Sequence, residues 1–251
     1  MDVLAEVEAV AGYTTYIDLI RPLIAGKQVI STGMTKEVDR VDAALELALG
    51  GTTCAVVSSG DPGIYAMAGL VFETCRSRGI AIVPARVPAA AGAKTAPDTL
   101  TIEVVPGIPA LCAGAALLGA PLTHDFAAVS LSDLLTPWET IEERLNAAAK
   151  ADFVIVLYNP KSKRRSENLK KAQRIVLKYR DGRTPVGIVT SAMRAGQAVE
   201  TIRLSDLHLA PVGMQTTVFI GSSASTTYLD FMMTPRGYGM KYRLEGGKTE
   251  G

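Results

Sequence analysis

The pattern of hydrophobic and polar positions changes most sharply in the first third of the chain. Ala55-Val56-Val57 is an apolar, β-branched run and predicts a buried strand. From Ile64 onward, apolar residues recur at Met67 and Val71, the i, i+3, i+7 spacing of one helix face. Residues 58–63, SSGDPG, separate the two patterns and are rich in turn-forming residues. The chain is therefore predicted to pass here from a strand, through a loop of small residues, into a helix.

The same succession of strand, short loop and helix recurs along the chain. Strands predicted over 101–105, 153–157 and 186–189 end in PGIPA, YNP and TSAMR, so each half of the chain has two such loops. Further strands are predicted over residues 29–30, 81–83, 128–131, 199–204 and 216–220, and helices over 2–11, 35–49, 110–118, 136–150 and 166–179. This alternation indicates the α/β class, in which ligands bind at the carboxyl ends of parallel strands.

Two helix starts have the residues of side-chain caps. Thr35 precedes the helix that closes at Gly50-Gly51. Thr136-Pro137-Trp138-Glu139 has the form of a capping box, with proline at the first helical position. We therefore expect hydroxyl caps at both sites.

The elements fall into two halves that no flexible linker separates. We expect an N-terminal α/β domain over residues 1–125, a C-terminal α/β domain over 126–244 and a disordered tail over 245–251. Residues 84–98 have no periodicity and several prolines, which is typical of a mobile surface insertion. Two domains connected in this way would be tightly joined.

Composition and charge narrow the class of protein. The 251 residues are 48% hydrophobic, and 26 basic residues nearly balance 25 acidic ones, for a net charge of +1. This balance gives no reason to expect nucleic acid or a membrane surface as a partner. Residues 104–123 have no charge, but their prolines and glycines favour a buried loop and helix over a membrane span. The acidic N-terminus lacks the basic region of a signal peptide.

The three cysteines indicate a reducing compartment. Cys54, Cys75 and Cys112 are odd in number, widely spaced and set in apolar segments, without the spacing of metal ligands. We therefore predict buried free thiols, no metal site and a cytoplasmic protein.

Asp61 is the only charged residue of the first loop. At the tip of a strand its carboxylate can accept a hydrogen bond from a hydroxyl or an amine, or face a cation. The glycines beside it let another molecule approach the backbone closely. A plain strand-to-helix turn explains the same residues without any ligand, so both interpretations stay open at this point.

Five motifs in order give the chain a family resemblance. They are SSGDPGIYAMAG, VVPGIPALCAGAALLGAPLTHDF, VLYNPKSKRR, GIVTSAMR and TTVFIGSS. Together they resemble the tetrapyrrole (class III) S-adenosylmethionine methyltransferases, over Gly12 to Tyr242. Members of that family usually open with a strand and a Gly-x-Gly-Pro-Gly loop upstream of the Gly12-Tyr13 match. This chain starts after that point, so we expect the first strand and its loop to be missing.

The resemblance implies two α/β domains of the tetrapyrrole methylase fold with S-adenosylmethionine in the cleft between them. It implies S-adenosylhomocysteine as a product and no metal, because S-adenosylmethionine brings its own leaving group and the protein has mainly to orient the reactants. The cofactor contacts implied by the matching positions are Ser59, Gly60, Asp61, Ile64, Pro109, Ala110, Asn159 and Ala192.

The implied substrate is a tetrapyrrole, whose acetate and propionate groups favour basic partners. The candidates are Lys161, Lys163, Arg164, Arg165, Arg194 and Arg236. A solvated helix entrance accounts equally well for the run from Lys161 to Arg165.

The motifs most resemble those of an enzyme that methylates precorrin-3B at C-17 and contracts the ring to precorrin-4 in cobalamin biosynthesis. Contraction requires a base, and His124 with Asp125 follows the helix of the second loop. A structural hydrogen bond is the other explanation of His124. Two alternative functions stay open. The chain is then another precorrin or uroporphyrinogen methylase of this fold, or an inert tetrapyrrole- or nucleoside-binding homologue. We also expect a homodimer.

Overall fold

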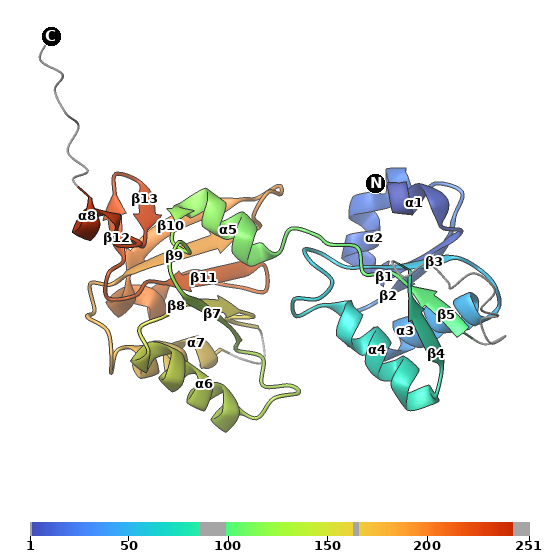
Figure 1. Ribbon diagram of the computed structural model, residues 1–251, viewed down its shortest axis with the longest axis horizontal. Helices are drawn as coiled ribbons and strands as arrows, with labels where there is room; N and C mark the ends of the chain where they lie inside the picture. Colours follow the sequence, from blue (N-terminus) through green and yellow to red (C-terminus); the bar gives the residue numbers. More distant parts are fainter. Residues whose placement is uncertain (1, 86–98, 163–165, 243–251) are drawn as a thin grey trace, which may run out of the picture. The chain divides into compact units, whose positions relative to one another are not determined.

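A computed structural model describes residues 2–85, 99–162 and 166–242. Its contacts divide the chain into unit 1, Met1–Pro109, and unit 2, Ala110–Gly251, which are described in turn (Figure 1). Most of the expected surface insertion, the basic residues Lys163, Arg164 and Arg165, and the expected tail lie outside the described residues.

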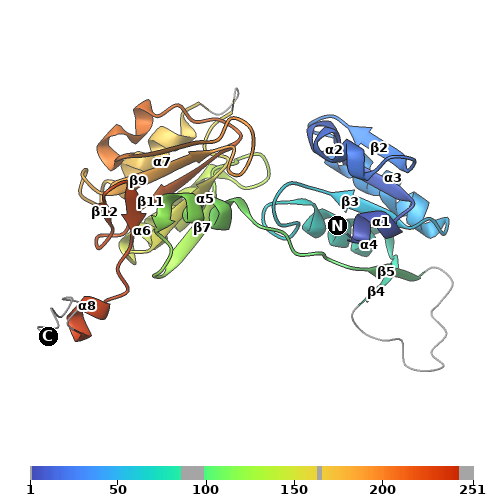
Figure 2. The same cartoon turned by 90° about the horizontal axis from the view of Figure 1, so that it is seen from above.

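Unit 1 is built on a sheet of three parallel strands. β1 (Ala9–Tyr13) lies at its centre, between β2 (Gln28–Thr32) and β3 (Cys54–Val57). β4 (Ala81–Pro84) and β5 (Thr99–Ile102) form a separate parallel pair (Figure 2). The helices of unit 1 are α1 (Asp2–Glu6), α2 (Thr14–Ile20), the 3-10 helix η1 (Arg21–Leu23), α3 (Glu37–Leu49) and α4 (Met67–Arg78).

Apolar clusters lie on both sides of this sheet. One cluster joins Val10 of β1 to Ile17 of α2. The other joins Val41 of α3 to Cys75 of α4. Burial on both faces explains why the central strand reads as a continuous small and apolar run, Ala9 to Ala11, in place of an alternating pattern.

The helix predicted over residues 2–11 is wrong in its second half. α1 ends at Glu6, and Ala9–Tyr13 form the central strand. The alanines in AVAGY favour a helix locally, but pairing on both edges of β1 overrides that preference.

The predicted side-chain caps of two helices are wrong, and so is the predicted start of the helix after the first loop. α3 begins after Lys36 and α6 (Trp138–Lys150) after Pro137, and neither cap residue makes a side-chain cap hydrogen bond. Thr35 instead takes a left-handed conformation, with φ 65°. The helix after the first loop starts at Met67, three positions later than Ile64, because the intervening residues form turns.

Unit 2 is built on a mixed five-stranded sheet of order β10-β9-β11-β8-β7. Its elements are α5 (Ala110–Leu118), β6 (Gly119–Ala120), β7 (Phe126–Ser130), α6 (Trp138–Lys150), β8 (Val154–Tyr158), α7 (Asn168–Val176), β9 (Pro185–Thr190), β10 (Ala198–Arg203), the 3-10 helix η2 (Leu204–Leu209), β11 (Thr216–Ile220), β12 (Thr226–Tyr228), β13 (Phe231–Met233) and α8 (Tyr238–Lys241). β12, β13 and β6 form a small second sheet.

The strand directions give the large sheet two distinct edges. β7 is parallel to β8, and β11 is antiparallel to both β8 and β9, so β7, β8 and β9 all run the same way. We call the edge where these three strands end the carboxyl edge; Tyr158 and Thr190 lie there. We call the edge where they begin the amino edge; Val154 and Pro185 lie there.

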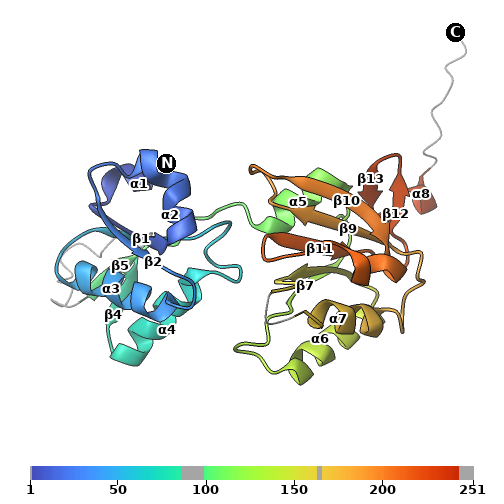
Figure 3. The same cartoon turned by 180° about the vertical axis from the view of Figure 1, so that it is seen from behind.

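Helices cover both faces of the large sheet (Figures 1 and 3). The core with α6 and α7 contains Val218 and Ile220 of β11, whereas the alternate residue Phe219 faces α5. α5 approaches so closely that a Cβ on Gly114 would lie 2.6 Å from the Phe219 ring. A Cβ on Gly187 of β9 would lie 2.4 Å from Leu118 of α5.

This packing explains why the domain boundary differs from the expected one. We placed the boundary after Asp125, but α5 packs on β9 and β11 and therefore belongs to unit 2, which begins at Ala110. Periodicity along the chain identifies a helix but not the sheet that it covers.

The cysteines are free, but they are not all buried. Cys75 is buried and Cys54 half-buried, and burial raises the pKa of both thiols. Cys112 is exposed, because Leu111, Gly114 and Leu118 form the face that α5 turns to the sheet. Among the described residues, no helix has both the length and the apolar character needed to cross a membrane.

Candidate functional site

The first loop follows β3, at the edge where all three parallel strands of the unit 1 sheet end. Ser59, Asp61 and Ile64 are half-buried and Gly60 is exposed, with a left-handed φ of 79°. The amide of Ile64 donates to the carbonyl of Asp61 at 3.2 Å, which makes the loop a defined turn. The loop therefore presents its backbone at a glycine that tolerates this conformation.

The Asp61 carboxylate joins the first loop to the second. Its Oδ1 accepts a hydrogen bond from the Gly63 amide at 2.8 Å, and its Oδ2 accepts one from the Gly107 amide at 3.1 Å. Gly107 lies 46 residues further along, in the segment after β5. The two loops are thus neighbours in unit 1, as their similar positions after β3 and β5 lead us to expect.

The second loop exposes several apolar side chains. Val104, Val105 and Ile108 are all exposed, although they are large and hydrophobic. Pro109 ends unit 1 and Ala110 begins α5 in unit 2; both are half-buried. Apolar side chains together with a few backbone polar groups line most small-molecule sites, so the residue types of the two loops are compatible with a nucleoside ligand.

Arg40 lies near the candidate site and was not expected there from the sequence. Its side chain is buried and lies where β2 ends: Nε donates to the Thr32 hydroxyl at 2.8 Å and Nη2 to the Gly33 carbonyl at 3.2 Å. Nη1 lies 3.6 Å from the sulfur of Met67, the first residue of α4. The helix periodicity could have predicted its burial, because Arg40 lies four residues before Ala44 on the buried face of α3.

The third loop begins at the carboxyl edge of the unit 2 sheet. Asn159 has a left-handed φ of 51°, and its Nδ2 donates to the hydroxyl of Ser130, at the end of β7, at 3.0 Å. The Tyr158 hydroxyl accepts a hydrogen bond from the Leu111 amide at 2.9 Å. The structure therefore brings Asn159 and Ala110, both expected cofactor contacts, to the same region of unit 2.

The fourth loop, after β9, is at the same edge. Ser191 and Met193 are left-handed, and between them Ala192 is half-buried. The Ser191 hydroxyl donates to Oε1 of Gln215 at 3.0 Å, and the Met193 amide donates to Oε1 of Gln197 at 2.8 Å. Neutral side chains thus hold this loop in a conformation that most residues avoid.

Two of the expected basic residues also lie at the carboxyl edge. Lys161 is exposed just after Asn159-Pro160, and Arg194 is half-buried in the fourth loop. Arg236 is elsewhere, since its Nη1 donates to the carbonyl of Thr123, in the segment that leads into the amino end of β7.

His124 and Asp125 are at the amino edge, away from Asn159 and Ala192. The Asp125 carbonyl accepts a hydrogen bond from the amide of Val154, the first residue of β8. Nδ1 of His124 accepts from the Asp125 amide at 2.8 Å and lies 3.7 Å from Asp125 Oδ2. The ring is 53% exposed. In its neutral form the imidazole therefore has its proton on Nε2, and its free electron pair is already engaged.

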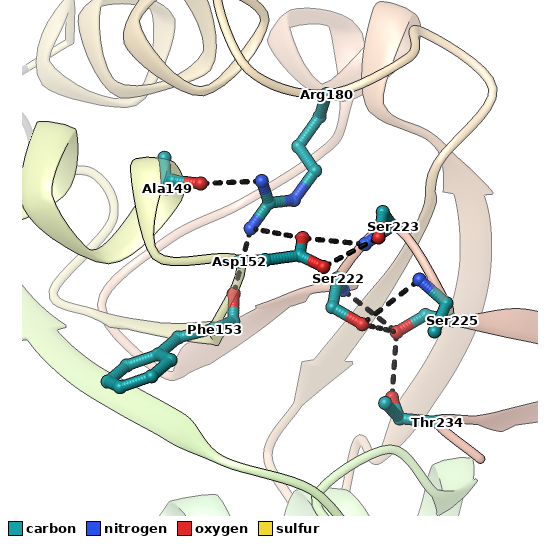
Figure 4. Close-up of polar contacts among 9 residues, drawn as sticks. Ala149, Asp152, Phe153, Arg180, Ser222, Ser223, Ser225 and Thr234 are labelled. Atoms are coloured by element: carbon teal, nitrogen blue, oxygen red, sulfur yellow. Dashed lines mark hydrogen bonds and ion pairs between the residues drawn. The ribbon is translucent and has the colours of Figure 1, made fainter. Parts of the chain in front are cut away.

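The amino edge also has a polar cluster around the buried Arg180 (Figure 4). The Arg180 side chain is 3% exposed; its Nη1 donates to the carbonyl of Ala149 at 2.6 Å and its Nη2 to that of Phe153 at 3.2 Å. Nη2 is also 3.0 Å from Asp152, whose carboxylate accepts from the amide and hydroxyl of Ser223. Burial lowers the pKa of Arg180, while Asp152 opposes that shift.

A hollow of about 310 Å³ lies at this same amino edge. Two arginines and several hydroxyl residues line it: Arg183, Pro185, Thr201, Ile202, Arg203, Ser225, Thr226 and Thr227. Since Pro185 and Arg203 pair with each other where β9 begins and β10 ends, the hollow is remote from the third and fourth loops and is no part of the candidate site.

Comparison with known families agrees with the motifs. The model of the tetrapyrrole (corrin/porphyrin) methylases matches residues 1–208. The chain belongs to this family of methyltransferases, and the predicted α/β fold class and family resemblance are confirmed.

The relatives point to one branch of the family. The chain is 47% identical over 243 residues to a cobalt-factor III methyltransferase of Priestia megaterium, covering 97% of this chain and 42% of that protein. It is 41% identical over 238 residues to a probable cobalt-factor III C(17)-methyltransferase of Salmonella typhimurium, covering 95% and 91%. The chain thus spans less than half of the Priestia protein and most of the Salmonella protein.

Solved structures show the same fold. The crystal structure of the methyltransferase CobJ matches with a TM-score of 0.78 and 34% identity, covering 93% of this chain and 91% of that chain. A uroporphyrin-III C-methyltransferase from Thermus thermophilus, solved as a complex with S-adenosylhomocysteine, matches with a TM-score of 0.61 at 20% identity and shares the fold alone.

Proposed function

We propose that this protein methylates a precorrin-3-type tetrapyrrole at C-17 and contracts its ring, with S-adenosylmethionine as methyl donor, in cobalamin biosynthesis. The relatives named above support the reaction and the pathway. The observation that favours a ligand site in this chain is the pair of loops joined through Asp61, with exposed backbone and exposed apolar side chains beside it.

The cofactor is proposed to bind along these loops. Ser59, Gly60 and Ile64 offer backbone groups in the first loop, and Val104 and Ile108 offer apolar surface in the second. S-adenosylmethionine brings its own leaving group, so the chain has to hold the reactants and exclude water, without a metal or a covalent nucleophile. The residues proposed to form the cofactor site, whether they touch the cofactor or position its loops, are Ser59, Gly60, Asp61, Ile64, Pro109, Ala110, Asn159 and Ala192.

The substrate carboxylates are proposed to meet basic residues of unit 2. Lys161 and Arg194 are the best supported, because both lie at the carboxyl edge, where Asn159 and Ala192 also lie. Arg236 has less support, since its guanidinium contacts Thr123 near the amino edge. Lys163, Arg164 and Arg165 stay predictions from the sequence.

The reaction is tested with the two substrates that differ in their metal. The purified chain is incubated with S-adenosylmethionine and either precorrin-3B or cobalt-factor III, and the product is identified by mass and absorption. We expect one added methyl group and a contracted ring. The names of the relatives favour the cobalt-containing substrate. Binding of S-adenosylhomocysteine without turnover on either substrate would contradict the proposal and favour a binding protein.

His124 stays a prediction as the base of ring contraction, with Asp125 beside it. A positioned base contributes about 100- to 10,000-fold, so His124→Ala should still add the methyl group and should accumulate the uncontracted product. The position of His124 at the amino edge, with Nδ1 engaged, favours the structural alternative. Contracted product at the normal rate would remove His124 from the mechanism.

We also propose a cytoplasmic homodimer. The three free cysteines support a reducing compartment. The exposed apolar side chains of Tyr228, Leu229, Phe231, Tyr238 and Met240 in unit 2 support association. A sedimentation mass near 26.5 kDa at micromolar concentration would contradict the dimer.

A further inference from the structure

The Asp61 carboxylate connects two loops of unit 1. One carboxylate oxygen is bonded to the amide of Gly63 in the same loop, and the other is bonded to the amide of Gly107 in the next. Each bond is charge-assisted, the stronger kind of hydrogen bond between side chain and backbone. Both oxygens therefore contact the protein's own backbone.

Gly107 is where the two backbones come closest. A Cβ built on Gly107 would lie 2.1 Å from the carbonyl oxygen of Gly60 and 3.3 Å from the Cα of Asp61. Gly60 itself has a left-handed φ of 79°. Because backbone cannot move away as a flexible side chain can, only glycine at position 107 allows the loops this spacing.

We propose that Asp61 and Gly107 form a clamp that sets the spacing of the first and second loops, and that Asp61 acts as a positioning residue through Gly107. The inference rests on the proposed function, since these loops are the ones proposed to hold the cofactor. The clamp fixes the backbone groups of Ser59 and Gly60 relative to Val104 and Ile108 before the ligand arrives. A preordered pair of loops binds more tightly because less conformational freedom is lost on binding.

The clamp itself is tested without any ligand. Hydrogen exchange of the segment 103–109 is compared in the unaltered protein and in Asp61→Ala. We expect faster exchange in the variant, because the Gly107 amide loses its acceptor. Asp39→Ala is the matched control: it removes an exposed carboxylate that pairs with Lys36 on α3 and should leave 103–109 unchanged. Equal exchange of 103–109 in Asp61→Ala and the unaltered protein would overturn the proposal.

The effect of the clamp on binding is tested at Gly107, which has no side chain to contact a ligand. Gly107→Ala should weaken S-adenosylhomocysteine binding about tenfold or more, measured by calorimetry at a temperature well below the melting temperature of the variant, so that the protein is folded in the assay. Gly69→Ala is the control, because a Cβ on Gly69 of α4 meets nothing within 4 Å. Asp61→Asn keeps one strong acceptor and should fall between Asp61→Ala and the unaltered protein.

The two positions should also be coupled. If they act through one contact, Asp61→Ala combined with Gly107→Ala loses no more affinity than the weaker-binding single variant. Normal binding by Gly107→Ala together with lost binding by Asp61→Ala would make Asp61 a direct ligand and overturn the clamp. If the unaltered protein fails to bind S-adenosylhomocysteine, the proposed function fails, and the exchange experiment still decides the clamp.

Discussion

The two units differ in the sheet edge at which a buried arginine lies. In unit 1, Arg40 and Asp61 lie where the parallel strands end, among the loops of the candidate site. In unit 2, Asn159 and Ser191 hold the site loops with neutral hydrogen bonds, and the buried Arg180 lies at the amino edge, where it pairs with the more exposed Asp152. Charged side chains therefore hydrogen-bond to the loops of the candidate site in unit 1, whereas in unit 2 the buried arginine lies away from those loops.

The largest loss of stability should come from removing the buried Arg180 of unit 2. Arg180→Met leaves the carbonyls of Ala149 and Phe153 and the Asp152 carboxylate without their partner. We expect the free energy of unfolding to fall by about 3 kcal/mol, at the low end for a broken buried ion pair because Asp152 is partly exposed. Trp138 of α6, the only tryptophan, reports unit 2 by fluorescence in urea.

Arg183→Met is the matched control for Arg180→Met. Arg183 lies three residues further on and pairs with Asp181 on the surface. Its loss should leave the urea midpoint nearly unchanged. Equal midpoints for both variants would show that the polar cluster around Arg180 contributes no more stability than a surface ion pair.

A close-packed glycine of unit 2 provides a second test of its framework. Gly187→Ala forces a methyl group against Leu118 in the core of unit 2 and should lower the free energy of unfolding by about 2 kcal/mol. Gly182→Ala, whose Cβ would meet Ser205 at an ordinary 3.5 Å, is the control. Urea unfolding measures both variants. If Gly187→Ala is neutral, α5 is less firmly packed on the sheet than its contacts indicate.

A smaller loss of stability is expected at Arg40 of unit 1. Among its described partners there is no carboxylate, so Arg40→Met removes a buried charge along with its bonds to Thr32 and Gly33. We expect a cost of about 1 kcal/mol in thermal unfolding, with weaker S-adenosylhomocysteine binding because α4 loses its tie to the end of β2. Unchanged binding would show that Arg40 stabilises unit 1 without contributing to the candidate site.

The smallest effect should be at the surface pair of unit 2. Hydrogen bonds from the Arg183 side chain and backbone lower the pKa of Asp181 from 3.8 to about 2. Because the folded-state pKa is lowered, the stabilisation is present above the unfolded value and is lost as pH falls through about 2. Arg183→Gln should move the Asp181 titration toward 3.8 in an NMR experiment. An unmoved titration would assign the shift to the Arg183 amide alone.

Several features of the fold and the site were predictable because they depend on nearby residues. The strands β3, β8, β9 and β11 follow from short apolar runs, and the helices α5 and α6 follow from longer segments without proline. The position of Asp61, Asn159 and Ala192 just after strands also followed from local pattern. The second half of the predicted N-terminal helix failed because Ala9 to Ala11 become a strand only when β2 and β3 pair with them.

By itself, the sequence determined the α/β class, the succession of strands and loops, and the membership of the methylase family. Tertiary structure decided which distant groups meet: Asp61 with Gly107, Arg40 with Met67, and α5 with β9 and β11. It also decided that His124 lies at the other edge of the sheet from Asn159. The physical reason is the distance along the chain over which each effect acts. Backbone preference and periodicity act over a few residues, whereas these contacts join residues that only the packing of whole elements brings together.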